Sequence, residues 1–223
     1  MLLTGPLTGM VNGLLIAKGR IAPLIVTLGG LAAYRSLALA LADGGEFRSS
    51  STSLFGYVGQ QGLPIPFTGL YLPFPVIVFV VLAVAGHQLL QRTRMGRYIV
   101  AIGCNQRAAE YSAVPVDRVK ILTYTLVGAF TAVSAVLISS RMNSVSSGQT
   151  GLFYELDAIA AVVIGGTRMS GGSGTIIGTV IGVLMLGVIG NMLNMLDAPI
   201  YLQGLVKGVI IVGAVLIQRP KKS

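Results

Sequence analysis

Few residues of this chain have side chains that could do chemistry. It has a single histidine, His87, and a single cysteine, Cys104, which excludes a CxxC metal site and an internal disulfide. Residues 165–174 are rich in glycine, as phosphate-binding loops are, but they lack the lysine and the strand-to-helix setting of a nucleotide loop. The acidic residues lie between the apolar stretches or at their ends. We therefore expect no catalytic residue, no metal site and no ATP site, and interpret the glycines as a tight reversal between two helices.

The composition indicates that the elements around these residues lie in a membrane. Hydrophobic residues make up 53% of the 223 residues and charged residues only 10%, against roughly 25% charged in a soluble domain. The apolar stretches are continuous rather than alternating, so they predict helices and not the strands of a barrel. A helix satisfies its own backbone groups in lipid. The chain is thus predicted to be an all-α integral membrane protein.

The lengths of the apolar stretches predict how many helices cross the bilayer. A crossing takes about 20 residues, and five stretches approach or reach that length: residues 21–42, 73–90, 119–140, 175–196 and 199–217. Residues 2–17 are short for a crossing, and residues 158–166 suffice only for a short or re-entrant helix. Residues 43–72 are polar and predict a surface segment with one short helix. We expect a polytopic helical bundle with about five long spans plus one short or re-entrant helix, forming one transmembrane domain over residues 1–223.

The basic residues predict the orientation of this bundle. The net charge of +9 could indicate nucleic-acid binding, but the basic residues lie between hydrophobic spans, so membrane topology explains them better and we expect no nucleic-acid partner. If each hydrophobic segment reverses the side of the chain, most of the basic residues fall on one side. They are Lys18, Arg20, Arg92, Arg94, Arg97, Arg107, Arg118, Lys120, Arg168, Arg219, Lys221 and Lys222. That side is predicted to be cytoplasmic and to hold the C-terminus, provided that residues 158–166 count as a pass.

A long polar segment at residues 91–120 separates two of the predicted spans. Asn105 to Ser112 is compatible with a short helix, bounded upstream by Gly103 and downstream by Pro115. Its small side chains would leave a surface that another protein can approach closely. The alternative is a solvated loop whose arginines only follow the topology. We favour a docking surface, because a simple reversal of the chain needs only a handful of residues.

Three ordered stretches resemble the permease subunits of ribose-type ABC sugar importers. The first includes Asn12-Gly13, Thr27-Leu28-Gly29 and Tyr34-Arg35. The second is GRYIVAIGCNQRAAEYS from Gly96, which is similar to the family pattern G-R-x-x-x-A-I-G-x-N-x-x-A-A-x-x-S. The third is LDAIAAVVIGGTRMSGGSGT from Leu156, which is similar to L-x-A-I-A-A-V-V-I-G-G-T-x-x-x-G-G-x-G-T. The resemblance covers essentially the whole chain. Directly after the second block, Ala113 replaces the glycine that is usual there.

The resemblance implies that the polar segment contains a coupling helix received by an ATP-hydrolysing subunit. The residues that we assign to this coupling site are Gly96, Arg97, Ala101, Ile102, Gly103, Asn105, Arg107, Ala108, Ala109 and Ser112. It also implies that the chain itself needs no cofactor, because a partner subunit uses the ATP. Family members usually carry further spans before the region that matches Leu2, so by this resemblance the chain is expected to lack the N-terminal spans.

Two other groups of residues are candidates for roles inside the bundle. Gly174, Gly178 and Gly182 recur every four residues, which indicates one helix face for close packing and, alternatively, a smooth pathway wall. Asn191 and Asn194 could bind a sugar hydroxyl in the translocation pathway or bridge two helices. Lys207 lies only about two turns from Pro199, so it could reach outward to the membrane surface. A role in transport is the less favoured interpretation.

Together these features predict a permease subunit and not an enzyme. We expect it to serve an ATP-driven importer of a monosaccharide or related small polyol in the bacterial inner membrane. The expected partners are a cytoplasmic ATP-binding subunit, a periplasmic sugar-binding protein, a second permease copy in a homo- or heterodimer, and the lipid bilayer. The alternatives are a secondary transporter, which would need a membrane-embedded carboxylate or similar ion site, and a truncated subunit that does not transport.

Overall fold

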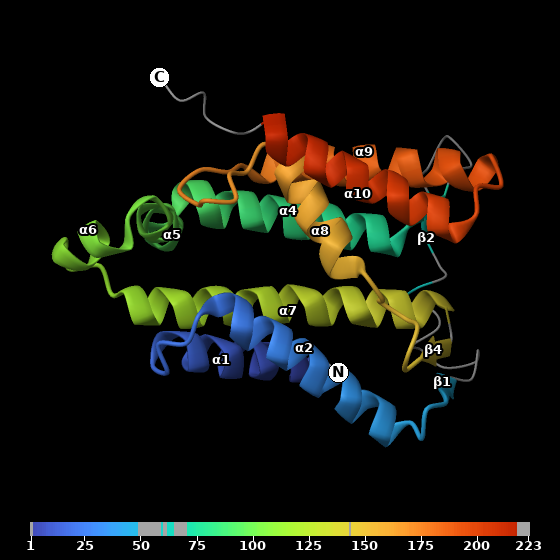
Figure 1. The fold of residues 1–223 in the computed structure, drawn as a ribbon, viewed down its shortest axis with the longest axis horizontal. Helices are drawn as coiled ribbons and strands as arrows, with labels where there is room; N and C mark the ends of the chain where they lie inside the picture. Colours follow the sequence, from blue (N-terminus) through green and yellow to red (C-terminus); the bar gives the residue numbers. More distant parts are fainter. Residues whose placement is uncertain (1, 49–58, 60–61, 65–70, 143, 218–223) are drawn as a thin grey trace. The chain divides into compact units, whose positions relative to one another are not determined.

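The computed structural model describes residues 2–48, 59, 62–64, 71–142 and 144–217, and these form a largely helical protein (Figure 1). The chain divides into two compact units. One comprises Met1–Leu82 and Ala113–Thr150, and the other comprises Ala83–Ser112 and Gly151–Ser223. Each unit is therefore built from two separated segments of the chain, and helix α4 (Phe74–Arg92) belongs partly to each.

The first unit is built on a glycine-rich contact between α1 (Thr4–Ala17) and α7 (Val116–Met142). Gly5, Gly9 and Gly13 lie four residues apart and face α7. A Cβ on Gly13 would lie 2.9 Å from the Cα of Ile121, and a Cβ on Gly9 would meet the carbonyl oxygen of Tyr124. The two backbones thus approach so closely that this face tolerates only glycine, which is a packing mode typical of membrane helices.

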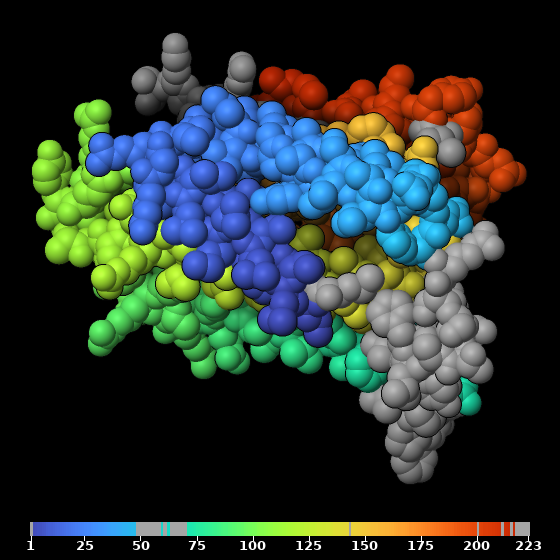
Figure 2. Space-filling view, turned by 90° about the horizontal axis from the view of Figure 1, so that it is seen from below, coloured from blue at the N-terminus to red at the C-terminus, as the bar shows by residue number. Residues whose placement is uncertain are grey.

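Helix α2 (Pro23–Leu41) contacts α1 and exposes most of its apolar side chains. The hydroxyl of Tyr34 donates a hydrogen bond of 3.2 Å to Oδ1 of Asn12, which links the two helices. On the outer side, Leu24 is 69% exposed and Leu37 is 60% exposed. Figure 2 shows α2 as a continuous blue ridge on one face of this unit. Apolar side chains that are left outside in this way suit a helix surrounded by lipid or by another membrane subunit.

Two short antiparallel strand pairs occur in the loops of the first unit, and the sequence did not predict them. β1 (Glu46–Arg48) pairs with β4 (Ser144–Ser146), and β2 (Gly62–Pro64) pairs with β3 (Tyr71–Pro73). Ser147 Oγ donates a hydrogen bond of 2.9 Å to the carbonyl oxygen of Gly45 beside the first pair. The short helix expected within residues 43–72 falls largely outside the described residues, while the described parts include these strands.

The second unit has a short helix packed against a long one. α8 (Tyr154–Ile164) has 11 residues, and it contacts α9 (Ile176–Met195) and α10 (Ile200–Ile217). Ala160, Ala161 and Leu186 form its buried core, with Ile164 against them. A helix of 11 residues is about 17 Å long, against about 30 Å of hydrocarbon, so it matches the short or re-entrant helix that the sequence predicts. The predicted short helix is therefore present, although it begins at Tyr154 and not at residue 158.

The described helices include four that are long and apolar enough to cross a membrane, namely α2, α4, α7 and α9. A further apolar segment, Tyr201–Ala214, lies within α10. At most 6% of the residues in the apolar window of each long helix are buried within the chain. The predicted all-α, polytopic architecture of about five long helices and one short one is thus confirmed, and most of its apolar surface faces outward.

Candidate functional site

The polar segment after α4 forms two helices, of which the sequence predicted only the second. α5 (Arg94–Cys104) begins directly after α4, and the Thr93 side chain caps it by accepting a hydrogen bond of 3.1 Å from the amide of Gly96. A Cβ on Gly96 would lie 2.5 Å from the carbonyl oxygen of Leu89, so the tight turn between α4 and α5 leaves no room for a side chain there. Sequence reasoning missed α5 because the segment was treated as one polar stretch, although Thr93 is a typical N-cap residue.

Asn105 separates α5 from α6 (Gln106–Tyr111) and caps the second helix. Its backbone is extended, with φ of −159°, and its side-chain Oδ1 accepts a hydrogen bond of 3.1 Å from the amide of Ala108. This is the short helix that the sequence predicted at residues 105–112. Its place between Gly103 and Pro115 follows from the capping chemistry of asparagine and from the exclusion of proline from helix interiors.

α6 exposes nearly all of its residues. Ala109 is only 5% exposed, whereas Arg107 and Ala108 are exposed and Tyr111 is 92% exposed. Gln106 Nε2 donates a hydrogen bond of 2.8 Å to Glu110 across the exposed face. An isolated six-residue helix would not be stable in water. Its position therefore depends on its cap, on Ala109 and on the chain that holds its two ends.

The C-terminal end of α5 packs against the glycine-rich turn between α8 and α9. A Cβ on Gly103 would lie 2.5 Å from the backbone nitrogen of Gly172, and Cys104 Sγ donates a weak hydrogen bond of 3.5 Å to the carbonyl oxygen of Gly172. Gly171 and Gly172 have φ of +87° and +79°, a conformation that favours glycine. The structure thus brings together two stretches about 70 residues apart in the sequence. Sequence reasoning identified both stretches but not their contact.

The glycines of α9 lie against α8. A Cβ on Gly178 would meet the carbonyl oxygen of Gly165, and one on Gly182 would meet that of Ala161. Gly174 lies in the turn before α9, where a Cβ would be 2.7 Å from the Thr167 side chain. Thr175 caps α9 by accepting a hydrogen bond of 3.1 Å from the amide of Gly178. These small residues therefore permit the close approach of α8 and α9.

Asn191 and Asn194 lie near the other end of α9 and are exposed. They are 16 and 19 residues along a helix that starts at Ile176, so they lie roughly 25 Å from the turn that contacts Gly103. Asn194 Oδ1 accepts a hydrogen bond of 2.9 Å from Gln203 Nε2. The structure therefore separates the sequence-predicted residues into two places: one around α5, α6 and the glycine-rich turn, and one at the far end of α9.

An ion pair near that far end was not predicted. Lys207 Nζ on α10 lies 2.8 Å from Asp157 Oδ2 on α8. Lys207, which by the sequence could reach outward to the membrane surface, is paired here with a carboxylate of a neighbouring helix. The signal in the sequence was the four-residue spacing of Gln203 and Lys207, which puts two polar residues on one face of an apolar helix.

The described residues contain no group of three or more His, Cys, Asp or Glu side chains that could hold a metal ion.

Comparison with known proteins identifies the family of this chain. Residues 1–215 match the family model of the branched-chain amino acid transport system permease component. The chain belongs to this permease family. It is a multi-pass membrane protein.

The similar curated proteins are permease subunits for sugars and related small molecules. The chain is 42% identical to the ribose import permease protein RbsC of Bacillus subtilis over 216 residues, 95% of this chain and 64% of the relative. It is 37% identical to RbsC of Escherichia coli K12, over 98% of this chain and 67% of the relative. It is 38% identical to the L-arabinose transport system permease protein AraH of E. coli K12, over 96% of this chain and 62% of the relative.

The permease thus spans about two thirds of the length of these curated relatives. No solved structure matches it. The resemblance to ribose-type permeases that the three sequence blocks carry is confirmed by these relatives.

Proposed function

We propose that this chain is the membrane-spanning permease subunit of an ATP-driven importer that moves a monosaccharide or related small polyol across the bacterial inner membrane. The observation that supports the proposal most directly is the exposed helix α6, anchored through Gly103 to the turn between α8 and α9. A force applied to α6 would reach α8 and α9 through this contact. The sugar-import names of the relatives support the substrate class.

The proposed partners follow from the two sides of the membrane. The side that holds α5 and α6 carries most of the basic residues, so we assign it to the cytoplasm and expect the C-terminus there. A cytoplasmic ATP-binding subunit would receive α6 and hydrolyse the ATP. A periplasmic sugar-binding protein would deliver substrate at the opposite side, and a second permease copy would cover apolar helix faces.

Coupling would work by a shift between two arrangements of the permease. A partner that binds α6 more tightly in one arrangement raises the population of that arrangement. The size of the shift is set by the difference between its affinities for the two arrangements. Because Gly103 and Gly172 pack backbone to backbone, a movement of α5 cannot be absorbed by a flexible side chain at this contact. The proposed coupling site therefore consists of α6 as the contact surface and Gly103 as its connection to the transmembrane helices.

Substitutions in α6, measured in permease that is assembled with its ATP-binding subunit, test the proposal. We expect Ala108→Arg to abolish copurification of the ATP-binding subunit and uptake of radiolabelled monosaccharide, because the added side chain blocks close approach to α6. Leu196→Arg is a matched control, since Leu196 is 75% exposed at the other end of α9. Unchanged ATPase binding and uptake in the Ala108→Arg protein would contradict the proposal.

A secondary transporter is the competing function. Such a transporter needs an ion-binding carboxylate among its apolar helices, and Asp157 on α8 is a carboxylate of this kind. The two functions differ in their energy source. Vesicles that contain the assembly would import monosaccharide with ATP in the presence of a protonophore and a sodium ionophore if the importer proposal holds. Uptake that needs an ion gradient and no ATP would favour the secondary transporter.

A further inference from the structure

Helix α5 turns away from α4 at a tight corner. Thr93 lies at the corner in an extended conformation, where its hydroxyl donates a hydrogen bond of 2.6 Å to the carbonyl oxygen of Leu89 and accepts one of 3.1 Å from the amide of Gly96. In Figure 1, α5 is seen almost along its axis, whereas the adjoining half of α4, which belongs to the same unit, lies across the view. α5 therefore runs across the end of α4 instead of continuing it.

The corner lies at the level of the lipid headgroups. α4 has 19 residues and is thus about 29 Å long, close to the roughly 30 Å of hydrocarbon in a bilayer. None of the residues in its apolar window is buried within the chain. Arg92 in the last turn of α4 therefore marks the boundary of the membrane. A helix that runs across α4 at this point lies along the membrane surface.

α5 has a basic face and an apolar face. The exposed residues recur at the spacing of one helix face, and they are Arg94, Arg97, Tyr98 and Ala101. The less exposed side carries apolar residues and glycines, namely Met95, Gly96, Ile99, Val100, Ile102 and Gly103. Such a helix is typical of the membrane interface, where arginine and tyrosine lie among the headgroups. Arg94 and Arg97, together with Arg92 at the end of α4, are here called the basic corner.

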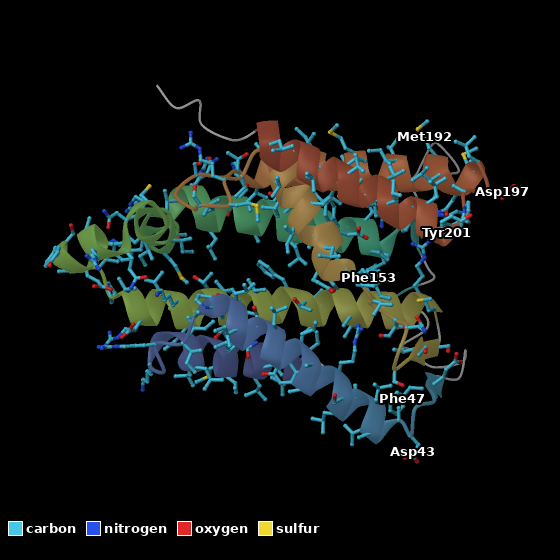
Figure 3. All side chains as sticks on the ribbon, in the orientation of Figure 1. Asp43, Phe47, Phe153, Met192, Asp197 and Tyr201 are labelled. Carbon is cyan, nitrogen blue, oxygen red and sulfur yellow. The ribbon has the colours of Figure 1, made fainter. Side chains whose placement is uncertain are left out.

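The basic corner has no acidic partner within the described ranges of the second unit. The carboxylates of this unit are engaged or placed elsewhere: Glu110 accepts a hydrogen bond from Gln106, and Asp157 pairs with Lys207. Figure 3 shows Asp197 at the end of the unit opposite to α5. Positive charges that stand so close together on the chain repel one another unless an anion lies between them. The anion that this corner needs must therefore come from outside the unit.

We propose that the basic corner binds the headgroup phosphates of anionic phospholipids, such as phosphatidylglycerol, and so holds α5 along the membrane surface. A guanidinium group donates paired hydrogen bonds to phosphate oxygens. An anionic headgroup keeps a net negative charge that balances the arginines, whereas a zwitterionic headgroup does not. The inference rests on the proposed importer function only in assigning this surface to the cytoplasmic leaflet. α5 would thus be held by lipid at its first turn and by Gly172 at its last.

Tryptophan fluorescence in vesicles tests this surface, because the chain has no tryptophan of its own. Tyr98→Trp places a reporter on the exposed face of α5, and Tyr111→Trp is the matched control, since Tyr111 is 92% exposed on α6. The permease is reconstituted in equal amounts of phosphatidylglycerol and phosphatidylcholine, with one lipid at a time brominated near the top of its acyl chains. We expect brominated phosphatidylglycerol to quench the Tyr98→Trp protein at least about twofold more strongly than brominated phosphatidylcholine. The Tyr111→Trp protein should show no such preference.

Loss of the arginines should remove the preference for the anionic lipid. We expect replacement of all three arginines of the basic corner by glutamine, in the Tyr98→Trp protein, to make quenching by the two lipids equal. Arg107→Gln is the control for lipid binding, because it removes one exposed charge from α6, and it should leave the preference in place. Equal quenching by both lipids with the arginines present, quenching by neither lipid, or the same preference at position 111 would each overturn the proposal. A preference that survives removal of the three arginines would overturn it as well.

The ATP-binding subunit is the competing occupant of the basic corner, since the resemblance assigned Arg97 to its contact. Addition of that subunit to vesicles with the Tyr98→Trp protein should leave the quenching unchanged, because α6 and not α5 receives the subunit. Loss of quenching on this addition would assign the basic corner to the subunit and overturn the lipid proposal. The lipid preference is measured on the permease alone. A failure of ATP-driven uptake would therefore contradict the importer function without changing this result.

Discussion

At Gly103, one added methyl group would lie 2.5 Å from the backbone nitrogen of Gly172. We predict that Gly103→Ala reduces monosaccharide uptake at least tenfold, because the turn between α8 and α9 must move to accept the methyl group, and overpacking of this kind typically costs about 1–3 kcal/mol. The measurement is uptake per unit of assembled complex, with ATPase activity recorded in parallel. ATP hydrolysis that continues without uptake is the expected sign of lost coupling.

Gly190→Ala is the control for this substitution. Gly190 lies within α9, and a Cβ there would have no neighbouring atom within 4 Å. Alanine is favoured over glycine in a helix interior by about 0.5–1 kcal/mol, so stability should stay the same or rise. A Gly103→Ala protein that transports as well as the Gly190→Ala protein would show that the contact with Gly172 has no role in coupling.

At the scale of the elements, α6 depends on its cap. We predict that Asn105→Ala loosens α6, because the amide of Ala108 loses its hydrogen bond to Asn105 Oδ1 and such a cap contributes about 1 kcal/mol. Hydrogen exchange followed by mass spectrometry should show faster exchange in residues 106–111 and little change in α9. Asn105→Asp retains a capping oxygen and should keep slow exchange. Equal exchange in the alanine variant and the wild type would contradict this role.

The pairing of α8 and α9 depends on glycine at one position and not at another. We predict that Gly182→Val strongly reduces the amount of folded protein, because its side chain would collide with the carbonyl oxygen of Ala161. Gly187→Val is the matched control, since a Cβ at Gly187 meets no atom within 4 Å. Detergent-solubilised yield and the melting temperature are the measurements. Similar yields for both variants would refute the close packing of these helices.

The same elements show how far the sequence alone predicts the structure. The long apolar helices and the short α8 follow from length and hydropathy, and α6 follows from Asn105 and the nearby glycine and proline. The contact of Gly103 with Gly172 and the ion pair of Asp157 with Lys207 do not follow. They depend on which helices pack together and on their register, and a periodic apolar pattern does not specify either. The β1–β4 pairing is missed for the same reason, since its strands lie about 100 residues apart.

At the scale of the whole molecule, the orientation in the membrane is a prediction from the distribution of basic residues. A reporter enzyme that is active only in the cytoplasm, fused after Ser223, should be active, and the same reporter inserted after Asp197 should be inactive. The physical reason is that loops rich in Lys and Arg are retained on the cytoplasmic side. The reverse pattern of activity would contradict the assignment of α6 to the cytoplasm and with it the proposed ATPase contact.

In the proposed importer, α6 receives an ATP-binding subunit and couples it to the transport of a monosaccharide. The most direct measurement is ATP-driven uptake of D-ribose and L-arabinose by proteoliposomes that contain the permease assembly, with the wild type and Ala108→Arg compared at equal permease content. We expect the wild type to take up sugar only with ATP, and the variant to lose both uptake and ATPase binding. Uptake by the variant at the wild-type rate, with the ATPase still bound, would contradict this role of α6.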